Sequence, residues 1–225
     1  MKTLVKLLVL LITTVITAQT SIKKSVGEFQ ELKVYDLIEV ELVKSNENKV
    51  EIMGENRENV VINNKNGILK IKMSIDKIFD GNATHVKLYY TTVDIIDVNE
   101  GAKVKSKDTV KQYEISLKAQ EGGEINVPIS TDYTNIKSVT GGIIKASGTS
   151  KMQNISIATG GIYEAKDLKT EKTEVSIKAA GEASVRASKL VDVKIRAGGD
   201  VYIYGNPETI NESKVFGGRI KRMDK

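Results

Sequence analysis

Apolar and polar residues alternate one by one through much of the chain after residue 100. The segments that show this most clearly are YEISLKA at 113–119, NISIA at 154–158, EVSIKA at 174–179 and VDVKIRA at 191–197. Alternation with a period of two is typical of a β-strand, because successive side chains of a strand point to opposite faces. The pattern therefore predicts a series of strands that each bury one face.

A turn signal recurs between these segments at a nearly constant interval. Seven positions mark it, and five of them are the second glycine of a Gly-Gly pair: Ala102, Gly123, Gly142, Gly161, Gly181, Gly199 and Gly218. The spacings between successive markers are 21, 19, 19, 20, 18 and 19 residues. Self-similarity at a fixed period of this length indicates a repeat architecture.

The positions around each marker stay apolar from one repeat to the next. Two residues after the marker stand Val104, Ile125, Ile144, Tyr163, Ala183, Val201 and Ile220. Four residues before it stand Val98, Ala119, Ser138, Ile157, Ile177, Ile195 and Lys214, and six before it stand Ile96, Leu117, Ile136, Ile155, Val175, Val193 and Glu212. A unit this short has no room for a crossover helix, so each strand is expected to pair with its counterpart in the next repeat.

We therefore predict an all-β fold in which residues 101–225 form a single-stranded parallel β-helix, or β-solenoid, with coils of about 19 residues. Glycine suits the corners because the chain bends sharply there, through positive φ, with the neighbouring coils close by. Glu212 and Lys214 occupy positions that are apolar in the other repeats. Residues 208–225 are accordingly expected to form a polar C-terminal cap.

Residues 26–100 also read as β-strands but follow no regular period. Asn66-Gly67 stands between the apolar segments VVIN and ILKIKM, which predicts a hairpin because Asn-Gly accepts the backbone of a type I′ turn. Because a hairpin is antiparallel, we expect residues 19–100 to be continuous with the solenoid and to cap its N-terminal end. The segment 75–85 is the expected loop of this region.

Residues 1–18 have the pattern of a signal peptide. Lys2 and Lys6 precede an apolar stretch from Leu7 to Val15, and Ala18 offers a small residue for cleavage. No second apolar stretch follows, so we expect an exported chain without a transmembrane segment, located in the periplasm or at the cell surface. The chain contains no cysteine, which excludes disulfides and thiolate chemistry. Its net charge of +5 is spread along the sequence and gives no reason to expect nucleic acid as a partner.

The N-terminal third and the corners together resemble a known family. The segments FQELKVYDLIEVELVKSNENKVEIMGENRENV at 29–60, NGILKIKM at 66–73 and EGAKVKSKD at 100–108, followed by serial Gly-Gly corners, are similar to the head GIN domain family of putative autotransporter adhesins. The resemblance extends from Phe29 to Gly218. It implies a right-handed, pectin-lyase-like β-helix and a role in cell adhesion, and it provides no catalytic residues to transfer.

The sequence contains no convincing catalytic, cofactor-binding or metal-binding constellation. Inverting glycosidases need two carboxylates about 6.5–9.5 Å apart, and the outward columns offer a single neighbouring pair, Glu182 and Asp200. Asp94, Asp97 and Glu100 interrupt a strand, whereas calcium usually binds a glycine-bearing acidic loop. His85 is the single histidine and has no cysteine with which to form a zinc site. We expect no catalytic residue, no cofactor and no metal.

One outward-facing cluster of apolar residues stands out in the middle of the solenoid. Ile143 and Ile162 occupy consecutive repeats one residue after the marker, and Val139 and Ala158 do so three residues before it. Apolar patches on a surface usually mark contacts with other molecules. These four residues are the candidate interface, either between copies of the chain or with a partner.

The sequence is thus typical of an exported, non-enzymatic β-helix protein that acts by contact, as an adhesin or another cell-envelope binding protein. Its partner would be a protein or a polysaccharide, and a homo-oligomer is compatible with the apolar cluster. The alternative is a polysaccharide lyase or hydrolase on the same scaffold, because a fold does not determine a function. That alternative requires acidic and basic residues clustered on one face of adjacent coils.

Overall fold

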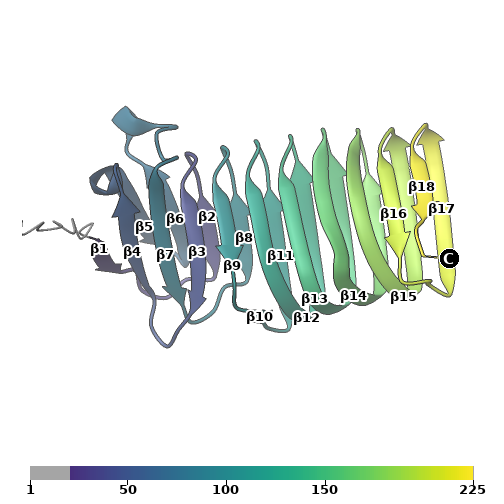
Figure 1. Ribbon diagram of the computed structural model, residues 1–225, viewed down its shortest axis with the longest axis horizontal. Coiled ribbons are helices and arrows are strands. Elements are labelled where there is room, and N and C mark those ends of the chain that lie inside the picture. The colour runs from purple at the N-terminus through teal and green to yellow at the C-terminus, as the bar shows by residue number, and fades with distance from the viewer. Residues whose placement is uncertain (1–20, 225) are drawn as a thin grey trace, which may run out of the picture.

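The protein is described from a computed structural model that covers residues 21–224, so the predicted signal peptide lies outside the described residues. These residues form an elongated stack of coils (Figure 1). Eighteen strands join into one hydrogen-bonded sheet that winds around a narrow core. Two single-turn 3-10 helices, η1 (Arg57–Asn59) and η2 (Ile75–Lys77), are the helical segments of this part of the chain.

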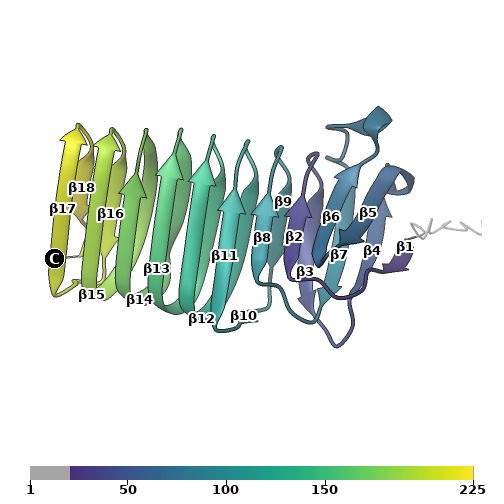
Figure 2. The same cartoon turned by 180° about the vertical axis from the view of Figure 1, so that it is seen from behind.

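The C-terminal two thirds form regular coils, as the repeat predicts. Their strands are β8 (Ile95–Val98), β9 (Lys103–Ser106), β10 (Val110–Lys111), β11 (Glu114–Ala119), β12 (Glu124–Val139), β13 (Ile143–Ala158), β14 (Gly161–Ile177), β15 (Gly181–Ala197), β16 (Asp200–Tyr204), β17 (Thr209–Phe216) and β18 (Arg219–Arg222). Strands β12 to β15 each run along one face of the stack, bend, and return along the other face (Figures 1 and 2). Glu124 pairs in parallel with Ile143, and Ile143 with Ile162, which is an offset of 19 residues from coil to coil.

The solenoid has two different edges. At the turn edge, drawn uppermost in Figure 1, a two-residue turn connects the end of one long strand to the start of the next. Thr140 and Gly141 form one such turn with φ of 50° and 71°, and the Gly142 amide donates to the Val139 carbonyl at 2.9 Å. Paired positive φ values are typical of a type I′ turn. At the opposite bend edge the long strands curve without a break in the sheet.

The marker glycines are required mainly because neighbouring coils approach closely at the turn edge. A Cβ atom on Gly142 would lie 2.2 Å from the carbonyl oxygen of Ala119 in the preceding coil, and one on Gly161 would lie 2.2 Å from that of Ser138. The sequence led us to expect positive φ at the markers themselves. This is confirmed at Gly181, Gly199 and Gly218, with φ of 133°, 112° and 94°. At Gly142 and Gly161 the positive φ falls instead on the two preceding residues, such as Thr159 and Gly160.

The inward columns expected from the sequence form the core. Val104, Ile125, Ile144, Tyr163, Ala183 and Val201 are all buried, as are the two columns that precede the corner up to Ile195. In the last coil Ile220 is half-buried, while Glu212 and Lys214 are exposed. Strands β17 and β18 still pair in parallel with β15 and β16. Like side chains therefore stack on one another along the solenoid until this last coil, whose role as a polar cap stays a prediction.

The N-terminal third contributes coils as well as antiparallel strands. Its strands are β1 (Ile22–Ser25), β2 (Glu31–Val34), β3 (Glu39–Lys44), β4 (Lys49–Gly54), β5 (Val60–Lys65), β6 (Ile68–Met73) and β7 (Thr84–Tyr90). Strands β5 and β6 are antiparallel, and Asn66 and Gly67 join them with φ of 53° and 76°. The hairpin thus lies where Asn-Gly predicts it. However, β6 also pairs in parallel with β2, so a hairpin strand can belong to a coil, contrary to our expectation.

The first coils are not stacked in the order of the chain. The coil formed by β2 and β3 pairs with β6 and β7 on one side and with β8 and β9 on the other. The antiparallel strands β1, β4 and β5 lie beyond β6 and β7 at the N-terminal end (Figures 1 and 2). The capping role expected of this region stays a prediction. No helix within residues 21–224 is both long and apolar enough to cross a membrane.

Two alanine substitutions in one corner distinguish close approach from backbone strain. Gly142→Ala is expected to destabilise the protein by at least about 3 kcal/mol, because its Cβ would collide with a backbone carbonyl that cannot move without breaking coil pairing. Gly141→Ala has open space around its Cβ and bears only the cost of a left-handed alanine, about 1–2 kcal/mol. Urea denaturation of both variants measures the difference. If both variants lost the same free energy of unfolding, close approach of the coils would not be the reason for glycine at position 142.

Candidate functional site

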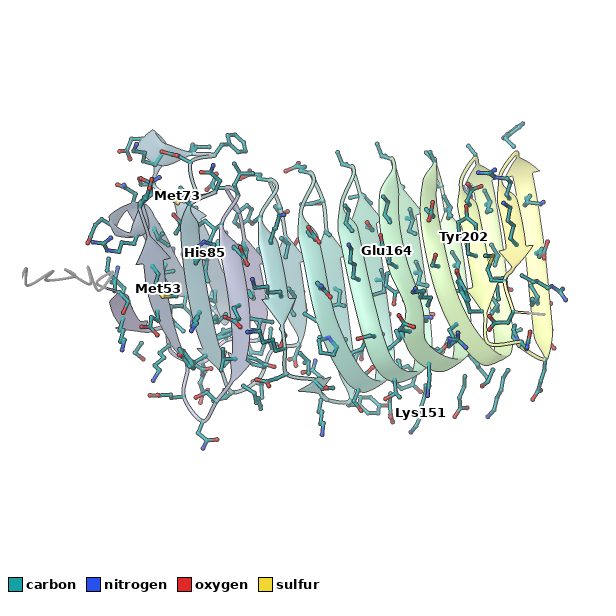
Figure 3. All side chains as sticks on the ribbon, viewed as in Figure 1. Met53, Met73, His85, Lys151, Glu164 and Tyr202 are labelled. Atoms are coloured by element: carbon teal, nitrogen blue, oxygen red, sulfur yellow. The ribbon has the colours of Figure 1, made fainter. Side chains whose placement is uncertain are left out.

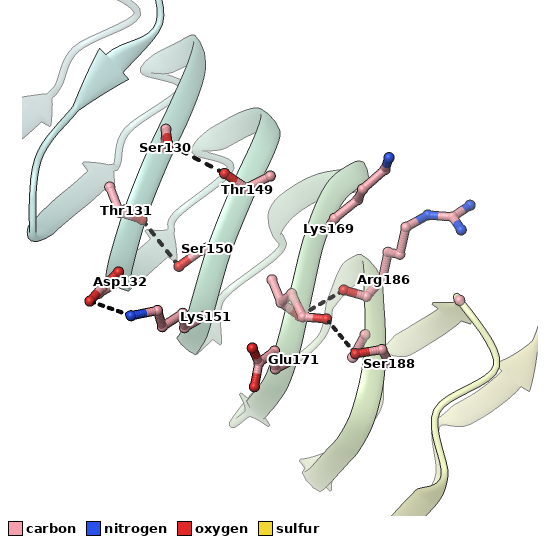
Figure 4. Close-up of a pocket in the computed structure, with 13 residues that line it drawn as sticks. Ser130, Thr131, Asp132, Thr149, Ser150, Lys151, Lys169, Glu171, Arg186 and Ser188 are labelled. Atoms are coloured by element: carbon pink, nitrogen blue, oxygen red, sulfur yellow. Dashed lines mark hydrogen bonds and ion pairs between the residues drawn. The ribbon is translucent and has the colours of Figure 1, made fainter.

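An open groove of about 600 Å³ crosses four coils at the bend edge (Figure 4). Strands β12, β13, β14 and β15 each contribute a short run of residues to it. The lining residues are Ser130, Thr131, Asp132, Thr149, Ser150, Lys151, Lys169, Thr170, Glu171, Arg186, Ala187, Ser188 and Gly205. Successive coils thus place the same positions side by side along the groove, where Lys151 marks the lower edge of the molecule in Figure 3.

Irregular pairing accompanies the groove. The register between β13 and β14 shifts between Lys145 and Gly148, and that between β14 and β15 shifts between Ala165 and Lys169 and again after Thr170. Extra residues in one strand of a pair bend it locally and leave backbone unpaired. The marker spacings of 20 and 18 residues around Gly181 are the sequence signal of this irregularity. Our sequence interpretation did not use that signal, and it missed the groove.

The floor of the groove begins with a cluster of buried hydroxyl groups. Thr131 Oγ1 lies 2.8 Å from Thr134 Oγ1 and donates to Ser150 Oγ at 3.1 Å. Ser150 Oγ also accepts from Thr134 at 2.9 Å and donates to the Met152 carbonyl at 3.0 Å. These inward positions of the bend therefore carry polar groups that satisfy one another, as buried polar groups must.

A second buried chain of hydrogen bonds continues under β14 and β15. The Tyr163 hydroxyl donates to Gln153 Oε1 at 2.8 Å, and Gln153 Nε2 donates to Thr173 Oγ1 at 2.9 Å. Thr173 lies 2.9 Å from Thr170, whose hydroxyl donates to the Arg186 carbonyl at 2.7 Å. Complete burial raises the pKa of Tyr163, so its hydroxyl stays protonated and serves as a donor. The chain fixes the inner wall of the groove from beneath.

Charged side chains line the rim of the groove in opposite pairs. Lys151 Nζ lies 2.8 Å from Asp132 Oδ2, and this hydrogen bond raises the pKa of the lysine. Just outside the lining, Lys189 Nζ lies 2.7 Å from Glu171 Oε2, and the hydrogen bond lowers the pKa of that glutamate. Arg186 donates to the Lys166 carbonyl at 2.7 Å and lies 3.5 Å from Asp224. The rim thus presents both signs of charge, already matched, together with the hydroxyls of Ser130 and Thr149.

Two exposed tyrosines lie at the N-terminal end of the groove. The rings of Tyr113 and Tyr133 meet edge to face with 5.3 Å between their centroids. They are 66% and 40% exposed. Tyr133 follows Asp132 directly, and the Asp132 amide donates to the Tyr113 carbonyl at 2.9 Å. The two rings thus lie beside one end of the groove, next to its lining residue Asp132, and are not themselves part of the lining.

The predicted interface residues lie away from the groove, around the turn edge. Val139 pairs with Ala158 and Ile143 with Ile162, so each pair occupies consecutive coils as expected. All four side chains are half-buried. Val139 and Ala158 lie on the face seen in Figure 2, which also carries β8 and β11. Ile143 and Ile162 lie on the face seen in Figure 1, which also carries β3 and β9. The two pairs thus flank the corners from opposite faces.

Two of the acidic residues weighed in the sequence, Asp200 and Asp97, have ionic partners. Glu182 and Asp200 are neighbours in adjacent coils, and Asp200 Oδ1 accepts from Arg219 Nε at 2.8 Å, which lowers the pKa of Asp200. Asp97 is buried, not on a strand surface as expected, because β2 stacks against β8 and places Lys33 3.4 Å away.

The remaining candidates lie apart from the groove. Asp94 is exposed and Glu100 half-buried. His85 Nδ1 lies 3.3 Å from Glu39, on the same face as Glu164 and Tyr202 (Figure 3). Among residues 21–224 no three histidine or acidic side chains are grouped closely enough to hold a metal ion.

The fold and the groove define a parallel β-solenoid with a groove that crosses several coils. The chain belongs to the family described as putative auto-transporter adhesin, head GIN domain, which it matches over residues 28–207. This confirms the family that the sequence resembles. The comparison with curated proteins gives no significant match.

Solved structures confirm the fold at low sequence identity. A putative adhesin from Bacteroides fragilis is 17% identical, with a TM-score of 0.84 over 92% of this chain and 98% of that one. A putative adhesin from Parabacteroides distasonis is 19% identical, with a TM-score of 0.73 over 91% of this chain and 96% of that one. A putative lipid binding protein from the same species is 20% identical, with a TM-score of 0.69 over 91% and 96% of the two chains.

The buried hydrogen-bond chain makes a testable contribution to stability. Thr173→Val removes the hydroxyl that serves both Gln153 and Thr170 and is expected to cost about 1–3 kcal/mol, because buried polar groups lose a partner. Thr149→Val, at the exposed rim, is the matched control and should stay within about 0.5 kcal/mol. Denaturant unfolding of the two variants measures both values. A loss of the same size at Thr149 would contradict a special role for the buried chain.

The predicted interface is tested by its effect on self-association. If Ile143 and Ile162 lie in a contact between copies, Ile162→Asp introduces a buried charge there and lowers the apparent mass in sedimentation velocity. Ser156→Asp, a half-buried position of the preceding coil on the opposite face, serves as the control. Unchanged mass and unchanged stability in Ile162→Asp would eliminate the interface.

Proposed function

We propose that this protein is exported and acts by contact, binding an extended polysaccharide along the groove at the bend edge. The observation that carries the proposal is the repetition of hydroxyl and charged side chains across four successive coils, beside the exposed rings of Tyr113 and Tyr133. Sugar hydroxyls pair with such polar groups, and the apolar face of a sugar ring stacks on tyrosine.

The shape of the groove favours a long polymer over a small ligand. Adjacent parallel strands lie about 4.8 Å apart, so each coil presents an equivalent contact at a regular interval. A polymer with repeated units can occupy several of these contacts at once, and linked weak contacts add up to strong overall binding. Small-molecule sites are usually enclosed, whereas this groove is open and carries charged and hydroxyl-bearing residues from every coil that it crosses.

The state of the acidic groups supports binding without cleavage. A glycosidase needs one carboxylic acid that stays protonated near neutral pH, which requires a raised pKa. In the groove the pKa of Glu171 is lowered by its hydrogen bond to Lys189. Outside the groove the pKa of Asp200 is lowered by Arg219. The pKa of Glu100 is raised by burial and by Asp36, but this residue lies at the turn edge, away from the groove. Membership of an adhesin family and the similar structures described as adhesins are consistent with a role in contact at the cell envelope.

Affinity electrophoresis in gels containing neutral or anionic polysaccharides, combined with an assay for new reducing ends, tests this function. We expect retention without cleavage. Tyr113→Ala/Tyr133→Ala should weaken binding by at least about fivefold, because it removes the stacking surface. Tyr202→Ala, an outward tyrosine on one face of the solenoid, should leave binding unchanged. If the variant without Tyr113 and Tyr133 were retained as strongly as the unchanged protein, the polysaccharide would bind elsewhere. New reducing ends would support the alternative of a polysaccharide-cleaving enzyme.

A further inference from the structure

The segment between β6 and β7 projects beyond the turn edge at the N-terminal end of the solenoid (Figures 1 and 2). It exposes three large apolar side chains, since Ile75 is 85%, Phe79 58% and Ile78 49% exposed. Leu37, in the turn of the adjacent β2–β3 coil, is exposed as well. We call these four residues the apolar tip.

The apolar tip is held in place by hydrogen bonds beneath it. The buried carboxylate of Asp36 accepts from the backbone amides of Met73 at 2.9 Å and Phe79 at 3.3 Å. On the outer side of the loop, Asn56 Nδ2 donates to the Asp80 carbonyl at 2.8 Å. Met73 lies at the base of this loop in Figure 3. The loop therefore presents its apolar side chains to solvent in a fixed arrangement.

The backbone of the tip is also strained. Leu37 and Phe79 have φ of 62° and 61°, a conformation that bulky side chains rarely adopt. Such strain persists where the surrounding structure enforces it, and it concentrates at sites with a function. Leu37 owes this conformation to its corner, because Asp36 and Leu37 form a two-residue turn like that of Thr140 and Gly141. Phe79 adopts it within the loop itself, where its bulky side chain is turned outward at an energetic cost.

Lysine side chains stand just below the apolar tip. Lys70 and Lys72 are exposed on β6 and line the same hollow as Ile75 and Ile78. Two acidic residues line it as well, but Asp36 is buried and accepts from the Met73 amide, and Glu100 is half-buried with its pKa raised by burial and by Asp36. Neither lysine forms an ion pair within residues 21–224, whereas Lys77 is paired with Asp80 at 3.2 Å. Asp76 is engaged by the Ser74 hydroxyl at 2.7 Å. An apolar tip above unpaired lysines fits the boundary between the acyl chains and the phosphate groups of a bilayer.

We propose that the apolar tip inserts into the surface of a lipid bilayer, with Lys70 and Lys72 placed at the lipid phosphates. A second copy of the chain fits the tip less well, because a stable protein interface buries about 800 Å² and some 20–30 residues on each side, and the tip offers four. The inserted area is small, so binding is weak and reversible. The tip and the bend groove lie at opposite edges, so the solenoid would stand on the membrane with its groove accessible.

A tryptophan reporter tests this insertion directly. The chain contains no tryptophan, so Phe79→Trp provides a single probe at the tip. The protein lacking residues 1–18, which contains every described residue, avoids lipid binding by the apolar stretch near the N-terminus. We expect the emission of Phe79→Trp to shift to shorter wavelength when vesicles of equal parts phosphatidylethanolamine and phosphatidylglycerol are added. Tyr113→Trp, at a 66% exposed position at the bend edge, is the matched control and should not shift.

Further substitutions in the Phe79→Trp protein separate lipid insertion from other causes. Ile75→Ser/Ile78→Ser should raise the lipid concentration needed for half of the shift by about tenfold or more. Lys70→Glu/Lys72→Glu should weaken binding to these anionic vesicles more than to phosphatidylcholine vesicles. The absence of a shift in the tip reporter, an equal shift in the bend-edge control, or an unchanged shift after the isoleucine substitutions would overturn the proposal. A shift that appears without lipid and grows with protein concentration would assign the tip to self-association instead.

Discussion

Parallel backbone pairing between coils sets the distance at which neighbouring coils stack, and the rest of the structure has to fit that distance. At about 4.8 Å there is no space at the turn edge for a side chain pointing at the next coil, so Gly142 and Gly161 meet the carbonyls of Ala119 and Ser138 directly. The same pairing places Ile125, Ile144 and Tyr163 in one column, which lets the core grow by repeating a single layer. It also places groove residues from four coils in parallel rows.

Much of this fold could be predicted from the sequence because each coil repeats the same pattern of strand and turn residues. Period-two alternation identified the buried columns, and the glycine markers identified the turn edge. Where the chain does not follow the 19-residue repeat, the repeat cannot indicate which coils become neighbours. The position of β2 and β3 between the β6–β7 and β8–β9 coils depends on pairing between residues far apart in sequence, such as Leu32 with Leu69 and Ile96. No local pattern in residues 26–100 specifies that order.

The candidate site was less accessible to sequence reasoning. Thr131, Ser150, Thr170 and Thr173 look like ordinary strand residues, and their mutual hydrogen bonds appear only when the bend brings them together. Tyr113 and Tyr133 are distant in the pattern but adjacent in space, because the chain pairs one coil with the next. At the bend the inward hydroxyls hydrogen-bond to one another, so the core can be polar there without unsatisfied donors or acceptors. The same residues lie beneath the hydroxyl and charged side chains of the groove and support them.

The out-of-order position of the β2–β3 coil has a consequence for how the chain folds. A solenoid whose coils follow the sequence can extend one layer at a time from either end, with each new layer adding to a neighbour already formed. Strands β2 and β3 need partners on both sides that come later in the chain, β6 and β7 on one side and β8 and β9 on the other. Pairings between distant residues close long loops and slow folding. Strands β2 and β3 therefore cannot complete their pairing until the chain has been made as far as β9, whereas each coil after residue 100 finds its preceding neighbour already present.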